Sequence, residues 1–233
     1  MAWVSLIIPA AGTGRRFGDR ENKIFKPIAG REIFLRALDA FAGRDDICQI
    51  QLVVSSRDLP EIRDRYSAEL DALGVSLTPG GASRTQSVRN ALANVQDKAE
   101  LIAVHDAARP CVSRMLIDTV FAQACKTLSA IPAYPVHGTL KIVDADWIVR
   151  RTQLHEEFWE AQTPQVFAKD ILLRAYSAGH QATDDAHLVE MLGVQVSVVM
   201  GDPRNIKITT PADLVLAEAV IGSLEARPHG DGA

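Results

Sequence analysis

The stretch "WVSLIIPAAGTGRRFGDRENK", residues 3–23, joins a hydrophobic run to a turn of small residues and then to several cations. The run from Trp3 to Ile8 predicts a buried strand, and the glycines after it let the backbone lie close to a ligand. Gly12, Gly14 and Gly18 are spaced as GxGxxxG, one residue longer than the dinucleotide fingerprint, and no P-loop pattern is present. Because open α/β sheets present ligands at such a turn, the stretch predicts an α/β fold with a ligand site here.

Three cations, Arg15, Arg16 and Lys23, follow the glycine turn. A nicotinamide dinucleotide has one bridging pyrophosphate and does not need three cations beside its glycines. Arginine presents a fixed fork of donors to phosphate oxygens, and lysine presents a compact charge. The cations favour a more highly charged ligand and a reaction in which negative charge grows on phosphorus. A solvated loop with incidental cations is the alternative at this point.

The composition of the 233 residues limits the class of protein. Hydrophobic residues make up 47% and charged residues 23% of the chain, so it can bury a core and is not predicted to be disordered. The formal net charge of −4 argues against nucleic-acid binding over a basic face. Cys48, Cys111 and Cys125 lack CxxC spacing, which fits a reducing compartment and no zinc site. No apolar run approaches the roughly 20 residues of a membrane helix, so we expect a cytoplasmic protein without nucleic-acid or membrane partners.

The rest of the chain alternates between short β-branched runs and amphipathic helical windows, which is typical of a mostly parallel sheet covered by helices. Further strands are expected at residues 50–55, 75–78, 101–105, 131–136, 194–199 and 205–208. Helices are expected at 31–42 and 59–73, from Ser83 or Arg84, after a Ser113 N-cap, between a Thr183 cap and Gly193, and from Pro211. We predict one domain over residues 1–223 and a flexible tail over 224–233.

Residues 137–160 interrupt this alternation. They are predicted to form two short strands, at 139–143 and 147–151, around a polar turn at Asp144 to Asp146. Two strands alone are marginally stable in water. A hairpin that carries Ile142, Trp147 and Ile148 is therefore expected to pack on another surface, such as a second copy of the chain.

The stretch "GGASRTQSVRNAL", residues 80–92, is the second candidate for ligand binding. Gly80 and Gly81 follow a predicted strand, and a helix begins directly after them. Free amides at that helix start can hold a phosphate or a base edge, and Ser87 can donate a hydrogen bond one turn further on. An ordinary connection between strand and helix is the alternative.

The stretch "VHDAARP", residues 104–110, places Asp106 at the end of a predicted central strand. An acid there, above a polyphosphate pocket, is a natural partner for Mg²⁺. Arg109 would add a second cation in the same cleft. His105 is interpreted as a hydrogen-bonded structural histidine.

Taken together, the stretches resemble the 2-C-methyl-D-erythritol 4-phosphate cytidylyltransferases of the non-mevalonate isoprenoid pathway. Six motifs occur in that family's order and spacing: "PAAGTGRRFG", "GGASRTQSV", "VHDAARP", "QTPQVF", "ATDDA" and "NIKITTPADL". The resemblance implies a nucleotide-diphospho-sugar transferase-like α/β/α sandwich of three layers with a mostly parallel sheet. It also implies a protruding β-arm, matched by residues 137–160, that exchanges across a homodimer.

The resemblance further implies that a phosphate oxygen of the acceptor attacks the α-phosphorus of CTP, in a Mg²⁺-dependent reaction. The products would be 4-diphosphocytidyl-2-C-methyl-D-erythritol and pyrophosphate. Arg16 and Lys23 match the positions that brace the α-phosphate in its five-coordinate state. The other matching positions are Ala10, Ala11, Gly12 and Gly14 for the triphosphate, Gly81, Ala82 and Ser87 for cytosine, Asp106 for Mg²⁺, and Asp106, Arg109, Thr163, Thr183 and Lys207 for the acceptor. Because the attacking phosphate is already ionised near neutral pH, alignment and charge neutralisation suffice without a general base.

The sequence departs from the family pattern in the arm. The family usually carries an acceptor-binding arginine eight residues before the threonine of "TPQ", and this chain has His155 there. Either Arg150 or Arg151 substitutes for it, or the acceptor phosphate is held more weakly and with pH dependence. Ala82 also stands where many relatives have an acid, and "NKI" stands where they have "PKQ".

Three other functions compete with this interpretation. A cytidylyltransferase for another polyol phosphate, such as ribitol 5-phosphate, would resemble the family closely. A nicotinamide-dependent oxidoreductase should have an acid at the end of its second strand, where this chain reads "VVSSRD" with serines. A catalytically inactive regulator would be expected to lack Arg16, Lys23 or Asp106, and all three are present.

Overall fold

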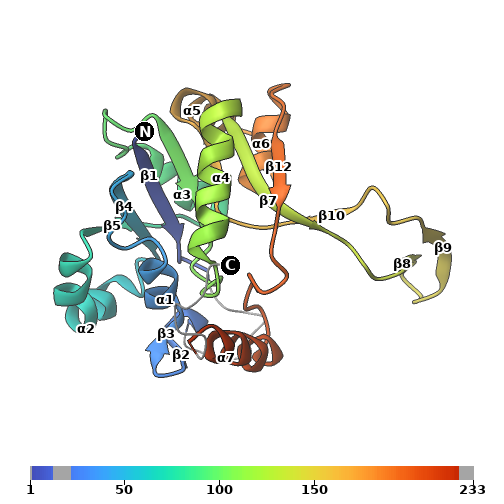
Figure 1. Ribbon diagram of the computed structural model, residues 1–233, viewed down its shortest axis with the longest axis horizontal. Helices are drawn as coiled ribbons and strands as arrows, with labels where there is room; N and C mark the ends of the chain where they lie inside the picture. The colour runs from blue at the N-terminus through green and yellow to red at the C-terminus, as the bar shows by residue number, and fades with distance from the viewer. Residues whose placement is uncertain (1, 13–21, 226–233) are drawn as a thin grey trace, which may run out of the picture.

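The computed structural model describes residues 2–12 and 22–225, and its centre is an eight-stranded sheet (Figure 1). Four neighbouring strands are parallel: β5 (Val75–Pro79), β4 (Ile47–Val54), β1 (Val4–Pro9) and β6 (Leu101–Val104). Beyond β6 the sheet continues with antiparallel β11 (Gln165–Ala168), then β7 (Ser129–Pro135), to which β10 (Trp159–Ala161) pairs antiparallel and β12 (Ser197–Met200) parallel. The prediction of an α/β fold with a mixed, mostly parallel sheet is confirmed.

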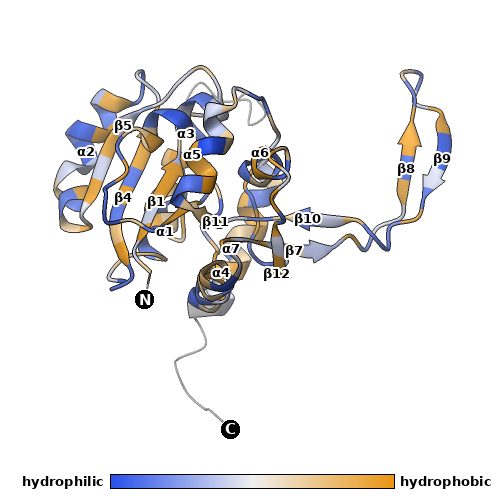
Figure 2. Ribbon diagram, turned by 90° about the horizontal axis from the view of Figure 1, so that it is seen from above, coloured by the Kyte–Doolittle hydropathy of each residue, from blue (hydrophilic) through white to orange (hydrophobic). Residues whose placement is uncertain are grey.

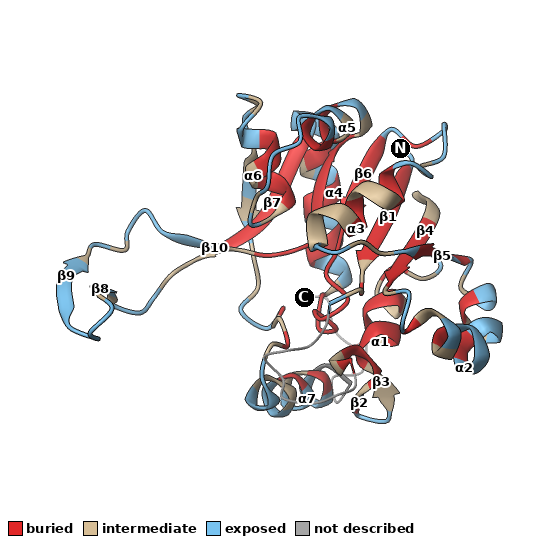
Figure 3. Ribbon diagram, turned by 180° about the vertical axis from the view of Figure 1, so that it is seen from behind, coloured by how far each residue is buried: buried red, intermediate tan, exposed pale blue. Residues whose placement is uncertain are grey.

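Helices cover both faces of this sheet. Helix α4 (Arg114–Thr127) lies in front of it in Figure 1, whereas α3 (Arg84–Leu92) and α5 (Lys169–Ser177) lie on the opposite face, which Figure 3 turns toward the viewer. The remaining elements are η2 (Lys23–Phe25), β2 (Pro27–Ile28), β3 (Arg31–Glu32), α1 (Ile33–Asp39), α2 (Leu59–Ala72), α6 (Asp185–Glu190) and α7 (Pro211–Glu225).

The central strands β1 and β6 are mostly hydrophobic because both of their faces are covered. In β1, Leu6, Ile7 and Ile8 are fully buried, and all four residues of β6 are buried as well. Such continuous apolar runs are typical of parallel strands between helical layers. The layers therefore hold the carboxyl ends of β1, β5 and β6 at one edge of the sheet.

The structure corrects three predictions about local elements. Residues 205–208 are not a strand; Ile208 instead donates its backbone N–H to Ala108 (2.8 Å) and is buried with α7 residues. Strand β11 was not predicted, because it is short and begins with Gln165 directly after a proline. Asp184, and not Thr183, caps α6 by accepting from the N–H of His187 at 3.0 Å. Helix α7 also extends to Glu225, two residues into the predicted tail, and residues 226–233 lie outside the described part of the chain.

The predicted arm extends away from the sheet in Figures 1 and 2. It carries the antiparallel hairpin of β8 (Leu140–Val143) and β9 (Val149–Gln153), which forms a sheet of its own. Trp147 at its turn is 88% exposed, and other large apolar side chains along the arm are exposed too. The boundary at 160 is corrected, because β10 pairs with β7 in the main sheet.

Candidate active site

A cavity of about 370 Å³ opens at the carboxyl ends of β1, β5 and β6. Residues after each of these strands line it, together with Asn22, Lys23 and Ile24 from the start of η2 and Lys207 and Thr209 from the segment before α7. This is the place where parallel α/β sheets bind ligands. Segments far apart in the sequence therefore meet around one cavity.

The first two turns around the cavity touch each other. A Cβ atom on Gly80 would lie 2.5 Å from Cβ of Ala11, closer than real Cβ atoms approach. Only glycine therefore lets the turn after β5 approach the turn after β1 this closely. Ala10, Ala11 and Gly12 line the cavity on one side of this contact, and Gly81 and Ala82 line it on the other.

The helix start after Gly81 is organised by two serines. Ser83 caps α3 by accepting from the N–H of Gln86 at 3.1 Å. The Ser87 hydroxyl donates to the carbonyl of Ser83 (2.8 Å) and accepts from the N–H of Gly81 (3.0 Å), while Ser87 also lines the cavity. The predicted helix start at Ser83 or Arg84 is confirmed, and its backbone surrounds one end of the cavity.

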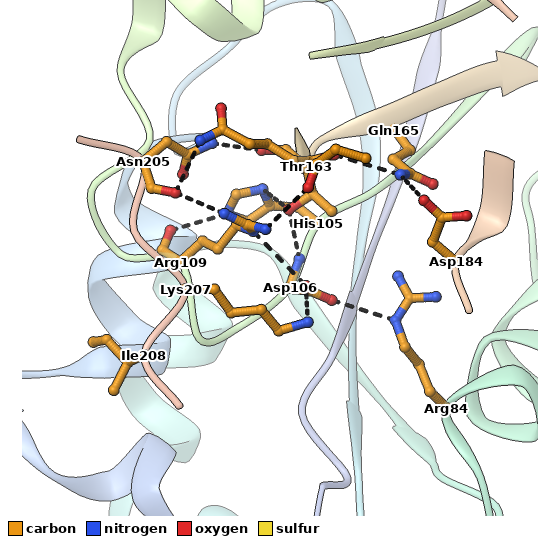
Figure 4. Close-up of polar contacts among 12 residues, drawn as sticks. Arg84, His105, Asp106, Arg109, Thr163, Gln165, Asp184, Asn205, Lys207 and Ile208 are labelled. Atoms are coloured by element: carbon orange, nitrogen blue, oxygen red, sulfur yellow. Dashed lines mark hydrogen bonds and ion pairs between the residues drawn. The ribbon is translucent and has the colours of Figure 1, made fainter. Parts of the chain in front are cut away.

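Asp106 is surrounded by three cations (Figure 4). Nζ of Lys207 lies 2.6 Å from Oδ2, Nε of Arg84 donates to Oδ1 at 3.3 Å, and Nε of Arg109 lies 3.9 Å from Oδ2. Burial raises the pKa of Asp106, but Arg84, Lys207 and Arg109 outweigh it and hold that pKa well below its ordinary value. Asp106 is therefore an ionised carboxylate at neutral pH.

Lys23, from the N-terminal part of the chain, lines the same cavity as Lys207 from the C-terminal part. Its Nζ donates to the carbonyl of Ile208 at 2.5 Å, next to Lys207. Asn22, directly before it, is buried, and its amide donates to the carbonyl of Ala10 (3.1 Å) and to Oδ2 of Asp58 (3.0 Å). Asn22 thus ties the start of η2 to the end of β1.

Arg109, Thr163 and His105 form a buried layer and do not line the cavity. Arg109 donates to the carbonyl of Asn205 at 2.7 Å, and Oγ1 of Thr163 accepts from the N–H of Asp106 at 3.1 Å. His105 contacts Thr163 through Nδ1 (3.0 Å) and the carbonyl of Arg109 through Nε2 (3.1 Å). Burial lowers the pKa of His105 to about 4, so its ring is neutral and serves structure, as expected from the sequence.

Besides Arg109 and Thr163, two more of the predicted site residues lie outside the lining of the cavity, and two cannot be placed. Thr183 is exposed next to the α6 cap, and His155 lies on the projecting arm. Gly14 and Arg16 fall outside the described residues, as do Arg15 and Gly18.

Sequence reasoning missed Asn22, Arg84 and Asp185 as parts of the site. Arg84 lies within a quoted motif but was considered only as a helix start, and Asp185 lies within the helix predicted between Thr183 and Gly193 and was given no role in the site. Arg84 and Asp185 are 101 residues apart in the chain, so local spacing gives no signal for the pair.

Within the described residues there is no group of three or more metal-binding side chains. Asp106 offers one carboxylate beside the glycine turn. Mg²⁺ is usually held by one or two carboxylates together with substrate phosphates and waters, so this donor set fits an ion that arrives with a polyphosphate. Among the described residues, no helix combines the length and apolar character needed to cross a bilayer.

Strand ends that present a glycine turn, a helix start and a carboxylate among cations are typical of a nucleotide-binding α/β enzyme. A sequence model of one enzyme family, IspD or 2-C-methyl-D-erythritol 4-phosphate cytidylyltransferase, matches residues 4–223. The chain belongs to this family and is a nucleotidyltransferase of isoprenoid biosynthesis, which confirms the resemblance seen in the motifs.

Individual relatives agree along nearly the whole chain. The 2-C-methyl-D-erythritol 4-phosphate cytidylyltransferase of Rhodopirellula baltica is 42% identical, over 94% of this chain and 95% of its own. That of Endomicrobium trichonymphae is 40% identical, over 93% and 98%. The crystal structure of the Thermus thermophilus enzyme superposes with a TM-score of 0.79 at 35% identity, over 94% of this chain and 98% of that one.

Proposed function

We propose that the chain joins CTP to 2-C-methyl-D-erythritol 4-phosphate and releases pyrophosphate, giving 4-diphosphocytidyl-2-C-methyl-D-erythritol. One observation carries this proposal: the glycine turn, Lys23 and the pair of Asp106 with Lys207 all line a single cavity. The family membership favours this reaction over ribitol 5-phosphate activation and over hydride transfer.

The nucleotide lies between the two touching turns in this proposal. Ala11 and Gly12 line the cavity and would lie against the triphosphate, since clusters of backbone amides hold anions well. The N–H of Ala10 donates to the carbonyl of Val53 at 2.7 Å, so Ala10 would contribute shape rather than a donor. The cytosine lies over Gly81, Ala82 and Ser87 at the start of α3. Contacts through backbone atoms would make the side chain at position 82 unimportant for base recognition.

The reaction forms a bond between an acceptor phosphate oxygen and the α-phosphorus and breaks the bond from that phosphorus to the bridging oxygen. Pyrophosphate leaves with the bonding electron pair. Lys23 and Arg16 neutralise the charge that grows on the α-phosphate, which is the main requirement of such transfers. His105 is neutral and buried against Thr163, which supports a reaction without a histidine base.

The acceptor is proposed to bind at Asp106 and Lys207, which line the cavity, above the buried layer that contains Arg109 and Thr163. A contact with Thr183 would need the acceptor to reach beyond the cavity to the start of α6. The acceptor's phosphate would meet His155, or Arg150 or Arg151, from the arm of a second copy. The exposed apolar side chains of the arm support an exchanged homodimer, because two strands alone are marginal in water. Arg150 pairs with Asp144 within the arm, which leaves Arg151 as the better candidate of the two.

Asp106 is the residue that would hold Mg²⁺, and the ion would supply positive charge to the phosphates. Lys207 contacts Oδ2 of the same carboxylate at 2.6 Å. A cytoplasmic location is also part of the proposal, and three free cysteines suit a reducing compartment.

The test is pyrophosphate release from CTP and Mg²⁺, with 2-C-methyl-D-erythritol 4-phosphate and ribitol 5-phosphate offered in parallel. Release with the former alone is expected. Release only with ribitol 5-phosphate, or with neither acceptor, would contradict the proposed substrate, and absence of CTP binding by calorimetry would contradict the proposed nucleotide.

A further inference from the structure

Arg84 bridges two carboxylates that belong to different parts of the fold. Its two terminal nitrogens donate to Asp185, from Nη2 to Oδ2 at 2.7 Å and from Nη1 to Oδ1 at 3.1 Å. Its third donor, Nε, points to Oδ1 of Asp106 at 3.3 Å (Figure 4). A guanidinium is planar and rigid, so an anchor on one edge fixes the direction of the remaining N–H.

Asp185 is a firm anchor because its surroundings hold it from several sides. Its side chain is fully buried, and it accepts a third hydrogen bond from the hydroxyl of Tyr176 on α5. Burial and the negative charge of Asp185 raise the pKa of Tyr176 well above its ordinary value, so the tyrosine remains a neutral donor. The N–H groups of Asp185 and Ala186 both donate to Oε1 of Gln165 on β11, at 3.1 and 2.9 Å.

The two oxygens of Asp106 are thereby held from opposite sides. Arg84 occupies Oδ1, and Lys207 occupies Oδ2. Of these two cations, Lys207 comes from a loop with a partly exposed side chain, whereas Arg84 is fixed by a bidentate pair to a buried residue. The Lys207 contact is the shorter one, at 2.6 Å against 3.3 Å, but Arg84 is the donor whose direction is fixed by a second, buried partner.

We propose that Asp185, acting through Arg84, is a positioning residue that orients the Asp106 carboxylate toward the acceptor. The inference rests on the proposed function, which assigns Asp106 to the acceptor and to Mg²⁺ and leaves the direct protein contacts of the nucleotide to the two glycine turns. Asp185 itself touches no substrate, because it lies behind Arg84 and does not line the cavity.

A purely structural pair would have a different signature. If the pair between Arg84 and Asp185 only joined α3 to α6, its loss would displace the start of α3. That start carries the cap Ser83 and the cytosine-facing residues Gly81 and Ser87, so CTP binding would suffer at least as much as acceptor binding. A positioning role affects the acceptor and spares CTP.

The test compares Asp185→Asn with the matched variant Tyr176→Phe. Asp185→Asn removes the charge that fixes Arg84, and we expect kcat/KM for the acceptor to fall by about 10²-fold, as a misplaced group does, while the CTP dissociation constant measured without Mg²⁺ stays within about twofold. Tyr176→Phe removes one neighbouring hydrogen bond but keeps the carboxylate, so the melting temperature falls and kcat/KM for the acceptor stays within about threefold. Arg84→Lys, which keeps a cation but cannot hold both carboxylates, should reproduce the acceptor loss if Asp185→Asn folds poorly.

Equal losses for CTP and acceptor, or an unchanged kcat/KM for the acceptor in Asp185→Asn and Arg84→Lys, would overturn the proposal. Dissociation constants for CTP and for the acceptor, measured by calorimetry apart from turnover, separate this inference from the proposed function. A wild type that binds both ligands without releasing pyrophosphate contradicts the proposed function. The role of Asp185 is still decided in that case by whether the variants weaken binding of the acceptor and leave binding of CTP unchanged.

Discussion

Three cations follow the glycine turn in the sequence: Arg15, Arg16 and Lys23. Lys23 is the one among the described residues, and it lines the cavity. Its Nζ lies against the carbonyl of Ile208, beside Lys207, so it is held at the edge of the proposed phosphate site. The reaction needs positive charge there only as negative charge grows on the α-phosphate.

We expect Lys23→Ala and Arg16→Ala each to lower kcat by about 10²-fold or more, because each removes a charge that acts in the transition state. Steady-state pyrophosphate release measures this effect, and circular dichroism checks the fold. Lys126→Ala, which changes an exposed lysine in the last turn of α4, is the control. A Lys23 variant with a near wild-type rate would contradict the assigned role.

A second prediction concerns Asn22 and its contribution to the stability of the fold. Burial raises the pKa of Asp58, but hydrogen bonds from Asn22, Arg57 and Ser55 lower it below its ordinary value, which shows a carboxylate that depends on its donors. Asn22→Ala removes the donor to Asp58 and to the carbonyl of Ala10, so the free energy of unfolding should fall by about 1–3 kcal/mol. Because Lys23 is the next residue, kcat should fall as well.

Chemical denaturation measures the free energy of unfolding of Asn22→Ala, and steady-state pyrophosphate release measures its kcat. Asn94→Ala is the matched control. Asn94 is exposed, and its side chain donates a hydrogen bond within its own helix end, at 3.2 Å to the carbonyl of Asn90. Equal stability losses in the two variants would remove the special role of Asn22.

Most of the elements were predictable because their signals are local. Ser83 and Ser113 accept from N–H groups three residues further on, as their position before an amphipathic window predicts. The strand predicted at 205–208 was wrong because Ile208 is hydrophobic for a different reason: it is buried with Ile221 of α7 and not in a sheet. The Thr183 cap was wrong because two adjacent residues, Thr183 and Asp184, could each serve as a cap, and the acid does so.

The arm hairpin is the element whose structure predicts association most directly. Trp147 is exposed at its turn with a φ of 62°, a left-handed conformation that asparagine adopts more readily than tryptophan. We expect Trp147→Asn to weaken the homodimer at least about 10-fold, because the ring is lost without backbone strain. Analytical ultracentrifugation measures the change, and Met115→Ala, at a 70% exposed apolar residue on α4, is the control. A wild type that remains monomeric at micromolar concentration would contradict the exchanged arm.

His155 tests whether the arm also meets the acceptor. His155→Arg should lower the KM for the acceptor, because arginine offers a permanent charge and a bidentate fork to the phosphate. The KM for CTP should not change, and it is measured in the same titrations. An unaltered acceptor KM would indicate that Arg151 or Arg150 already fills this role.

For the whole molecule, the buried charge at Asp106 links stability to pH. Its pKa in the folded state is below its unfolded value of about 3.9, so its ionised form contributes stability above that pH, and the contribution is lost as pH falls through the folded pKa. Asp106→Asn leaves Arg84, Lys207 and Arg109 without their shared anion. We expect the variant to be less stable than the wild type at pH 7, with a difference that shrinks below about pH 4. Denaturation at pH 7, 5 and 3 measures it, and a difference independent of pH would contradict the ionised state.

The site as a whole was only partly readable from the sequence. The glycine turns and Asp106 are recognisable because each follows a strand at the same edge of the sheet. The pair of Arg84 with Asp185 is not, since it depends on how α3, α5 and α6 pack together. Thr163 was placed by family resemblance, and Arg109 was predicted as a second cation in the cleft from its position after Asp106. The structure puts both in the buried layer and not in the lining of the cavity.

The hydrogen bond from Lys23 to the carbonyl of Ile208 has a consequence for when the active site forms during synthesis of the chain. These two residues are separated by 185 positions, and Lys207 reaches Asp106 from the same late segment. Domains begin to fold as they leave the ribosome, amino end first. A nascent chain that has emerged only as far as residue 200 can already have paired β1, β4, β5 and β6 and joined the two glycine turns. It still lacks the backbone segment that closes the cavity, so we expect ribosome-bound chains halted there to be ordered but inactive, and activity to begin only when the last stretch before α7 has emerged.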